Sequence, residues 1–405
     1  MIYDLVLGCG FLCWHLFRKK KQYPSLRQFL GLDIPDPKGR PVLWVHAVSV
    51  GEVKAVSLLA QKLKGEKFLL VTTQSMTGQE EVKRSIPQAD AVCPLPLDFS
   101  WVMNQWAKKL KPEMLVLVEG DFWYHMLRAV KRCGGKTVLV SGKLSETSAR
   151  RFGWVKWLSR KLFSQLDLVL VQSDVHKQRF MPFVEPQKLH VTGNLKFDAM
   201  PETRDNMLLP KQTFPIAVTC THPGEEQELL DALAHIDATI YLAPRHPERF
   251  PLVAEFLTSQ KIPFVRWSQL PEATGNEKVV LVDAMGQLPV VYRHCQLAIL
   301  AGSFSSKIGG HNVLEPCLYG CPVLFGPHMQ HQTELMNYVV AAGAGKQVRD
   351  SGLADEVKAF RQEPETMRAA AAELKNRRGQ VLETTLDLVH RDLLVHTARN
   401  HCTGN

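Results

Sequence analysis

The sequence predicts an α/β protein with two doubly wound, Rossmann-like domains. Its 405 residues exceed the size of one ordinary domain, so two are expected. From Pro41 onward, short continuous apolar runs alternate with segments whose apolar residues recur every three or four positions. This alternation is typical of a parallel sheet covered by helices on both faces. The pattern starts again after residues 198–215, a polar, proline-containing stretch that we interpret as a linker.

Each apolar run places one strand. In the first domain we expect strands at residues 42–45, 68–72, 114–118, 137–140 and 168–171, with a clear helical pattern at residues 53–63. In the second we expect strands at residues 216–219, 238–242, 264–266, 279–282, 298–300 and 323–325, and helices at residues 225–234 and 250–259. The two domains are predicted to cover residues 18–205 and 206–405 and to face each other across a cleft.

The N-terminal segment, residues 1–17 (MIYDLVLGCGFLCWHLF), is mostly apolar but contains Asp4 and His15, and four basic residues follow it directly. Its length is the minimum for spanning a bilayer. A cleaved signal peptide is disfavoured because the basic cluster follows the apolar run. Three interpretations fit: a short membrane anchor with a cytoplasmic basic flank, an amphipathic helix in the interface, and a first buried helix of the N-terminal domain.

Positive charge is concentrated in the first half of the chain. The formal net charge is +9, from 49 Lys and Arg against 40 Asp and Glu. Residues 1–200 hold 30 of the basic and 17 of the acidic residues, net +13, which leaves net −4 for the rest. The asymmetry predicts contact with a polyanion or an anionic membrane surface, with residues 18–21 and Lys108, Lys109 and Lys111 as candidates. Charge alone would also suit nucleic acid, but the sequence has no accompanying zinc finger, RNP-type motif or heptad-backed basic region, so we expect no such partner.

Composition and cysteine usage exclude several classes of protein. The 45% hydrophobic and 22% charged content is that of an ordinary globular protein, not of a disordered or fibrous chain. The nine cysteines form no C-x-x-C pair and have no histidine-rich tract beside them. Neither a disulfide framework nor a zinc site is indicated, and a reducing compartment fits best.

The loops after the strands of the first domain carry candidate acids and a candidate cation. Ligands of open parallel sheets bind beyond the carboxyl ends of the strands. After the first strand, a small-residue loop with Ser49 precedes Glu52, which we place at the helix start; capping and catalysis explain this carboxylate equally well. Glu119 and Asp121 follow the third strand, and a helix N-cap would explain Asp121 but not Glu119. Lys196 ends the domain, where a lone lysine is usually solvated.

The second domain has four loops suited to a nucleotide. Residues 219–226 (TCTHPGEE) open a helix, which makes this turn receptive to anions. Arg245 follows the next strand and can pair with a phosphate in forked geometry, and residues 283–288 (DAMGQL) follow a third strand. The glycine-rich residues 301–316 offer N–H donors to phosphate, and Glu315 can hold two ribose hydroxyls. Together these loops predict a nucleotide-sugar site.

Other nucleotide chemistries lack their motifs. No G-x-G-x-x-G follows the first strand of either domain, which argues against a nicotinamide dehydrogenase. The P-loop motif G-x-x-x-x-G-K-[ST] and the hydrolase motif G-x-S-x-G are both missing from the sequence. Group transfer from a nucleotide-activated donor is the class that remains.

Seven loops resemble, in order and with similar spacing, the consecutive motifs of the bacterial Kdo transferases: residues 46–52, 119–123, 193–198, 221–226, 244–249, 283–288 and 309–316. Those enzymes are lipid A glycosyltransferases that use CMP-Kdo (Kdo is 3-deoxy-D-manno-oct-2-ulosonate). The resemblance runs from the N-terminal segment to about Pro327. It implies a GT-B architecture, an inverting transfer, and an acceptor that is the lipid A disaccharide precursor at the cytoplasmic face of the inner membrane.

The resemblance also implies roles for individual residues. The family's general base falls on Glu52 of V-S-V-G-E, and its assisting carboxylate on Glu119, where E-G-D-F-W replaces the E-T-E-L-W of many members. The lysine of N-L-K-F-D, with a role in stabilising transition-state charge, falls on Lys196. The implied contacts of CMP are Pro244, Arg245, Met285, Gly286, Gln287, Asn312, Val313, Leu314 and Glu315. Family members commonly have Glu where Gln287 stands.

The departure of CMP builds negative charge on its phosphate. We expect Arg245, the backbone N–H groups of Gly309 and Gly310, and the helix start at Asn312 to stabilise that charge without a metal. No D-x-D motif is evident, and a nucleoside monophosphate has less charge to neutralise than a diphosphate. We therefore expect no metal and no cofactor besides the donor substrate.

Two other functions fit the same sequence features. One is another GT-B transferase that uses a UDP-sugar, and the other is a non-catalytic, nucleotide-binding membrane protein. A transfer assay that compares CMP-Kdo with UDP-sugars separates these alternatives.

Overall fold

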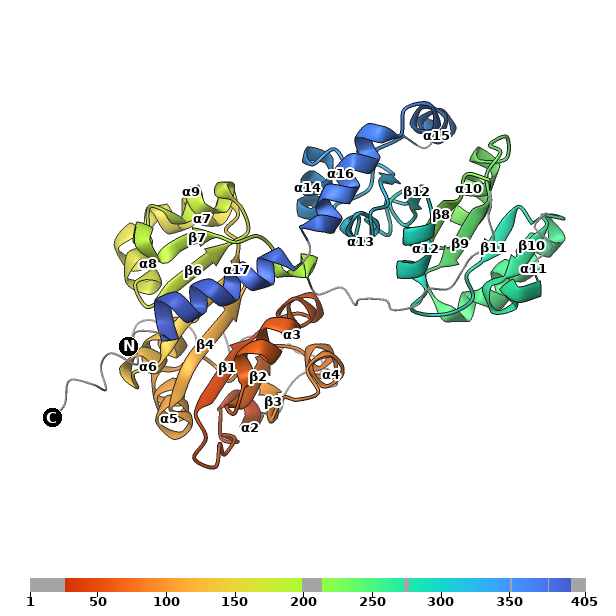
Figure 1. Ribbon diagram of the computed structural model, residues 1–405. Coiled ribbons are helices and arrows are strands. Elements are labelled where there is room, and N and C mark those ends of the chain that lie inside the picture. The colour runs from red at the N-terminus through yellow and green to blue at the C-terminus, as the bar shows by residue number, and fades with distance from the viewer. Residues whose placement is uncertain (1–25, 199–212, 273–276, 350–351, 378, 395–405) are drawn as a thin grey trace. The chain divides into compact units, whose positions relative to one another are not determined.

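Two compact units make up the chain, and the computed structural model describes residues 26–198, 213–272, 277–349, 352–377 and 379–394 of them (Figure 1). The first unit comprises Met1–Ala199 and Gly379–Asn405, and the second comprises Met200–Arg378. Each unit contains one seven-stranded sheet in which every strand pair is parallel. The predicted α/β class with two doubly wound domains is confirmed.

Three predicted features lie outside the described residues: the anchor at residues 1–17, the basic residues 18–21 and most of the linker at residues 198–215. Within the described part of the chain, no helix combines the length and the apolar character that crossing a bilayer requires.

The sheet of the first unit has the strand order β3-β2-β1-β4-β5-β6-β7. Its strands are β1 (Val42–His46), β2 (Phe68–Thr73), β3 (Ala91–Pro94), β4 (Pro112–Val118), β5 (Lys136–Gly142), β6 (Leu168–Val171) and β7 (Leu189–Val191). Every side chain of β1, β2 and β6 is buried, as continuous apolar runs predict for a sheet covered on both faces. The strand order reverses between β1 and β4, so the loops after these two strands open at the topological switch point, where ligands bind in such sheets.

Helices cover this sheet on both faces (Figure 1). They are α2 (Leu26–Phe29), α3 (Val50–Lys64), α4 (Met76–Ser85), α5 (Ser100–Leu110), α6 (Tyr124–Arg132), α7 (Glu146–Trp154), α8 (Lys156–Phe163), α9 (Asp174–Phe180) and α17 (Gln380–Val389), with short turns η2 (Pro186–Lys188), η3 (Leu195–Phe197) and η7 (His390–Leu394).

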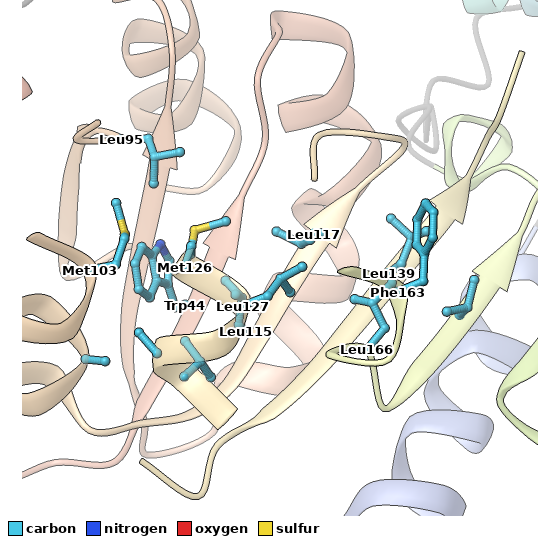
Figure 2. Close-up of a cluster of buried hydrophobic side chains, with 14 of the residues drawn as sticks. Trp44, Leu95, Met103, Leu115, Leu117, Met126, Leu127, Leu139, Phe163 and Leu166 are labelled. Atoms are coloured by element: carbon cyan, nitrogen blue, oxygen red, sulfur yellow. The ribbon is translucent and has the colours of Figure 1, made fainter. Parts of the chain in front are cut away.

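The core of the first unit is built from aromatic and aliphatic side chains (Figure 2). The ring of Trp44 on β1 lies 5.7 Å from that of Trp106 on α5, centroid to centroid. Both indoles are buried, so their N–H groups need partners. Trp44 donates to Thr72 Oγ1 at 2.9 Å, and Trp106 donates to the Gly31 carbonyl at 2.8 Å. This packing fixes the strands whose ends carry the candidate site.

The end of the chain returns to the first unit, which corrects the predicted second domain of residues 206–405. The Asp198 carboxylate accepts from the backbone N–H of Gly379 at 2.6 Å and from that of Leu382 at 2.5 Å, and so caps α17. Gly193 has a φ of +103°, and a Cβ there would stand 2.8 Å from Val381 Cγ2. Glycine therefore lets α17 approach the first unit closely. The amphipathic pattern of α17 reveals a buried face but not which unit it packs against.

The sheet of the second unit has the order β10-β11-β9-β8-β12-β13-β14 and reverses between β8 and β12. Its strands are β8 (Ile216–Thr221), β9 (Ile240–Pro244), β10 (Phe264–Arg266), β11 (Val279–Leu281), β12 (Leu297–Leu300), β13 (Val323–Phe325) and β14 (Gly345–Gln347). Its helices are α10 (Glu225–Ala232), α11 (Phe250–Ser259), α12 (Leu288–His294), α13 (Leu314–Leu318), α14 (Thr333–Ala341), α15 (Leu353–Gln362) and α16 (Glu365–Asn376), with turns η4 (Pro247–Arg249) and η5 (Trp267–Glu272).

All the strands that the sequence predicted are present, but three further strands were not predicted. These are β3, β7 and β14, each at the edge of its sheet. They are three or four residues long and only partly buried, so they lack the continuous apolar run that reveals a central strand.

Candidate functional site

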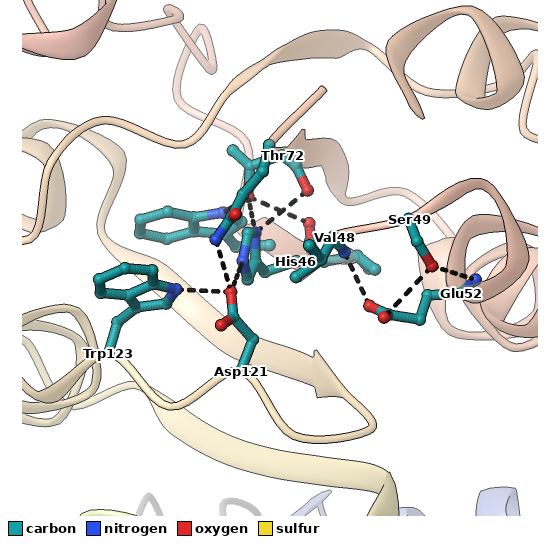
Figure 3. A network of polar contacts seen from close by, with 10 residues as sticks. His46, Val48, Ser49, Glu52, Thr72, Asp121 and Trp123 are labelled. Carbon is teal, nitrogen blue, oxygen red and sulfur yellow. Dashed lines mark hydrogen bonds and ion pairs between the residues drawn. The ribbon is translucent and has the colours of Figure 1, made fainter. Parts of the chain in front are cut away.

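Glu52 stands in the first turn of α3, at the switch point of the first sheet. The helix begins at Val50 and not, as predicted, at Glu52 itself, because Ser49 is the N-cap. Ser49 Oγ accepts from the Glu52 N–H at 3.3 Å, and the Glu52 carboxylate accepts from the Val48 N–H at 2.7 Å and from Ser49 Oγ at 3.3 Å (Figure 3). These reciprocal bonds resemble a capping box. They also fix the direction of the Glu52 carboxylate.

The surroundings of Glu52 favour its protonated form. Burial raises the pKa of Glu52, the hydrogen bond from the Val48 N–H opposes this, and the negative charge of Glu119 raises the pKa further. The net result is a pKa above that of an ordinary glutamate. A carboxyl group with a raised pKa is suited to take a proton from an alcohol and to hold it.

Glu119 directly follows β4 and is only 3% exposed. Its backbone φ of +62° is rare for a residue with a side chain and places the carboxylate at the switch point. Lys143 Nζ lies 2.7 Å from Glu119 Oε2, and Lys196 Nζ forms an ion pair with Oε1. Burial alone would raise the pKa of Glu119, but the two lysine charges outweigh burial and hold the pKa below its ordinary value.

Lys196 reaches Glu119 because of the residues around it in N-L-K-F-D. Asn194 Oδ1 accepts from the Lys196 N–H at 3.0 Å, and Ser141 Oγ accepts from the Leu195 N–H at 2.9 Å. Leu195 and Phe197 are buried on either side, which directs Lys196 the other way. The lysine passes beside the first turn of α3, since a Cβ on Gly51 would stand 3.7 Å from Lys196 Cε. The three predicted catalytic residues thus meet in the first unit, and Lys196 is ion-paired instead of simply solvated.

Sequence reasoning missed Lys143, the second cation beside Glu119. The signal was available, because Lys143 directly follows β5 and β5 pairs with β4. Finding it required the strand order, which short apolar runs do not reveal.

A second polar network lies beside the Glu52 loop (Figure 3). Asp121 Oδ2 accepts from Trp123 Nε1 at 2.6 Å and from Gln74 Nε2 at 2.9 Å, and it lies 3.0 Å from His46 Nε2. The N-cap interpretation of Asp121 is wrong, because α6 begins at Tyr124 and its N-cap is Trp123. Asp121 instead links the loop after β4 to the last residue of β1 and to the loop after β2.

In the second unit, four of the predicted nucleotide contacts line one pocket. Pro244 and Arg245 come from the end of β9, and Met285 and Gly286 come from the loop after β11. Cys220, near the end of β8, lines the same pocket. Gln287 caps the start of α12 and is not among the residues that line this pocket.

The glycine-rich loop after β12 differs from its prediction. The Gly309 N–H donates to the Ser305 carbonyl at 3.3 Å, and the Gly310 N–H donates to the Gly302 carbonyl at 3.0 Å. These two N–H groups, which we expected to be available to a phosphate, are therefore hydrogen-bonded within the loop itself. Both glycines have positive φ, and a Cβ would stand 2.3 Å from His331 at Gly309 and 2.5 Å from Met329 at Gly310. Close packing explains these glycines.

The remaining predicted contacts, residues 312–315, lie at the start of α13. Asn312 Oδ1 accepts from the Leu314 N–H at 3.2 Å, and the side chains of Val313 and Leu314 are buried. These two residues can offer a ligand only their backbone. Burial raises the pKa of the Cys220 thiol, and the negative charge of the partly buried Glu315 raises it further, which indicates that the Glu315 carboxylate lies near the pocket.

Three histidines from separate loops gather near Arg245. His222 Nε2 and His311 Nε2 are 2.8 Å apart with their rings nearly parallel, and the ring centroid of His246 is 5.7 Å from that of His222. Burial lowers the pKa of His311 to about 4, and the nearby charges of His222, Arg245 and His246 act in the same direction. An arriving anion would relieve this repulsion. Within the described ranges, no three potential ligands are arranged to hold a metal ion.

Comparisons with known proteins agree with these motifs. The family model "3-Deoxy-D-manno-octulosonic-acid transferase (kdotransferase)" matches residues 22–199. The 3-deoxy-D-manno-octulosonic acid transferase of Chlamydia trachomatis serovar A is 33% identical over 380 residues, 88% of this chain and 88% of that protein. The protein of the same name from Haemophilus influenzae is 31% identical over 324 residues, 76% of this chain and 74% of that protein.

A solved structure extends the likeness to the fold. MurG of Acinetobacter baumannii superposes with a TM-score of 0.55 over 87% of this chain and 99% of that one. At 13% identity this likeness shows the fold alone, and it agrees with the two-domain GT-B architecture that the motifs implied. Sequence identity over most of the chain, with every motif in order, leads to one conclusion: the chain belongs to the 3-deoxy-D-manno-octulosonic acid transferase family of glycosyltransferases.

Proposed function

We propose that this Kdo-transferring glycosyltransferase moves Kdo from CMP-Kdo to the lipid A disaccharide precursor in lipopolysaccharide biosynthesis, with Glu52 as its general base. The observation that carries the proposal is the juxtaposition of Glu52 with the buried Glu119 at the switch point of the first unit. The transfer inverts the anomeric centre, because a single displacement needs one base and no covalent sugar–enzyme intermediate.

Glu52 is suited to deprotonate the attacking sugar hydroxyl. Its raised pKa gives the carboxylate the proton affinity that a base needs, while its bonds to Val48 and Ser49 hold it in one orientation. In the transfer, the acceptor oxygen forms a bond to the anomeric carbon of Kdo and gives its proton to Glu52. The bond between that carbon and the phosphate oxygen breaks, and CMP leaves with the electron pair.

Glu119 and its two lysines have a different task. The low pKa of Glu119 keeps its carboxylate ionised, and this negative charge helps to keep the pKa of Glu52 raised. Glu119 is thus a positioning residue that acts through Glu52. Two lysines against one carboxylate leave this cluster with a net positive charge. That charge suits Kdo, which carries a carboxylate, and an acceptor that carries phosphates.

The second unit binds the donor in this proposal. Arg245 at the pocket of Pro244, Met285 and Gly286 would hold the phosphate of CMP and stabilise the charge that develops as CMP leaves. Because a monophosphate leaving group carries little charge, one arginine and the nearby histidines are sufficient, and we include metal independence in the proposal. We also place the enzyme on the cytoplasmic face of the inner membrane, where a basic first half suits an anionic leaflet.

Replacing the base tests the proposal. Glu52→Gln keeps the shape of the side chain but removes its basicity, so transfer from CMP-Kdo to a tetraacyl lipid A precursor should fall by about 10²–10⁴-fold. Mass spectrometry measures the product, and titration with CMP should give an affinity within about twofold of the unchanged enzyme.

Two results would contradict the proposal. Undiminished turnover by Glu52→Gln would refute the base assignment, and turnover with UDP-sugars in place of CMP-Kdo would refute the donor. Activity that persists after treatment with EDTA is the expected outcome for metal independence.

A further inference from the structure

Two tryptophans stand almost fully exposed where α7 meets α8. Trp154 is 77% exposed and Trp157 is 72% exposed, and the intervening Val155 and the following Leu158 are 45% and 48% exposed. These four residues stand on either side of Lys156 in the sequence, and we call them the tryptophan surface. An exposed apolar cluster of this size on a folded unit marks a surface that meets something other than water.

The fold of the first unit does not need these side chains. The opposite face of the two helices is anchored by Phe152 and Phe163, whose ring centroids are 5.2 Å apart. These rings contact Phe122, Phe180 and Phe183 in an aromatic cluster. Ser159 Oγ donates to the Phe152 carbonyl at 2.8 Å and fixes the bend between the helices. The outward direction of both tryptophans thus follows from packing on the other side.

The charged residues nearest to the tryptophan surface in the sequence are all basic, and the nearest acidic residues are Glu146 and Asp167. Residues 147–166 contain five basic residues and no Asp or Glu: Arg150, Arg151, Lys156, Arg160 and Lys161. All five are exposed, and none is ion-paired with a carboxylate in the described part of the chain. A protein interface would be depleted of lysine and would mix charges of both signs, whereas an anionic lipid surface attracts a basic rim.

We propose that the tryptophan surface docks the first unit on an anionic membrane. The indole rings of Trp154 and Trp157 lie among the lipid headgroups, where tryptophan is enriched, and the five basic residues pair with lipid phosphates. The inference deepens the proposed function and rests on it, because it gives the enzyme a surface on the leaflet that holds its lipid acceptor. Lys143, the partner of Glu119, lies on the loop that leads directly into α7, so the surface is linked to the candidate site through a short stretch of chain.

Quenching of tryptophan fluorescence by brominated lipids tests the contact directly. The full chain has eight tryptophans, and Trp14 falls in the predicted anchor, so every variant carries Trp14→Phe. In vesicles of brominated phosphatidylcholine with phosphatidylglycerol, Trp154→Phe/Trp157→Phe should lose at least half of the quenching. Trp267→Phe is the control, because Trp267 is only 6% exposed in the second unit and should leave quenching unchanged. Full quenching in the double variant would overturn the proposal.

Charge reversal tests the lipid preference. Arg151→Glu/Lys156→Glu should bind phosphatidylglycerol-containing vesicles at least about 30-fold more weakly, because each basic residue near such a surface contributes a factor of about five. Transfer to an acceptor embedded in those vesicles should fall with binding, whereas transfer to a detergent-dispersed acceptor should not change. Equal loss in both assays, or dimerisation through Trp154 and Trp157 in sedimentation experiments, would refute membrane docking. A chain that docks but transfers nothing would instead refute the proposed function.

Discussion

The charged residues of the two candidate sites differ in how far the protein itself neutralises them. The first unit has Glu119 with two lysines, and the second unit has Arg245 at its pocket. Glu119 is buried and paired with Lys143 and Lys196, so its charge is balanced by the protein itself. Arg245 stands exposed at its pocket, and no carboxylate is paired with it among the described residues. Proton transfer requires a site whose pKa values are set in advance, whereas anion binding requires positive charge that the ligand itself neutralises.

The same contrast appears in the titratable groups. In the first unit, burial and a neighbouring negative charge raise the pKa of Glu52. In the second unit, burial and neighbouring positive charges lower the pKa of His311 and of His222. The raised pKa of Glu52 strengthens the hold of its carboxylate on a proton taken from an alcohol, whereas the lowered pKa of each histidine keeps its ring neutral until an anion arrives.

The largest expected effect comes from removing the balanced charge of the first unit. Glu119→Gln takes away the negative charge that raises the pKa of Glu52 and leaves two lysines that lower it. The pKa of Glu52 should fall, the acidic limb of the pH profile of kcat should move to lower pH, and kcat should fall by about 10²–10³-fold. Glu113→Gln at the start of β4 is the control, and an unshifted acidic limb would mean that Glu119 does not act on Glu52.

A smaller effect is expected on stability at acidic pH. The pKa of His311 is lowered to about 4 in the folded chain, so the unfolded chain binds the proton more readily. The unfolding free energy of the second unit should therefore decrease as pH falls from about 6.5 toward 4, by about 3 kcal/mol at most. In His311→Asn this decrease should be smaller by that amount. Chemical denaturation across this range measures it, with exposed His235→Asn as the control, which should keep the full decrease.

The affinity for CMP should depend on Arg245, the cation that no described carboxylate neutralises. Arg245→Ala should weaken the affinity for CMP by about 10–100-fold, because it removes a charge-assisted hydrogen bond to phosphate. The midpoint of thermal unfolding should stay the same, since Arg245 is exposed and forms no ion pair with another described residue. Calorimetric titration measures the affinity, and Arg349→Ala serves as an exposed arginine of the same unit that should have no effect. An unchanged affinity for CMP in Arg245→Ala would mean that Arg245 does not bind the phosphate of CMP.

The smallest expected effect is a difference in how salt acts on the two sites. Between about 50 and 500 mM NaCl, the affinity for CMP should fall a few-fold, because an exposed arginine is screened. The value of kcat at saturating donor with detergent-dispersed acceptor should change less than twofold, since the ion pairs of Glu119 are buried. If kcat fell with salt as steeply as the affinity for CMP, the ion pairs of Glu119 would be as exposed to salt as Arg245, and the contrast between the two sites would be wrong.

Much of this architecture was predictable from the sequence, and the reason is burial. Central strands such as β1 and β6 are enclosed on both faces and read as unbroken apolar runs, whereas the edge strands β3, β7 and β14 are not. The loops at strand ends located Glu52, Glu119 and Lys196, and the structure brings these residues together. Their roles rest on the family resemblance and stay predictions.

What was not predictable depended on strand order and on local backbone geometry. Lys143 meets Glu119 because β5 lies next to β4, and Asp121 turns toward His46 instead of capping a helix. The N–H groups of Gly309 and Gly310 were expected to be free, but the loop folds back and uses them. Residue types reveal which groups a loop carries, but only its conformation reveals which of them a ligand can reach.

The return of α17 to the first unit has a consequence for biosynthesis. On the ribosome, the strands β1 to β7 emerge first, yet Asp198 waits for Gly379 and Leu382 until the whole second unit has been translated. The nascent first unit therefore lacks the contacts of α17 with Gly193 and Asp198 for that interval, and it is completed only after the second unit has been translated.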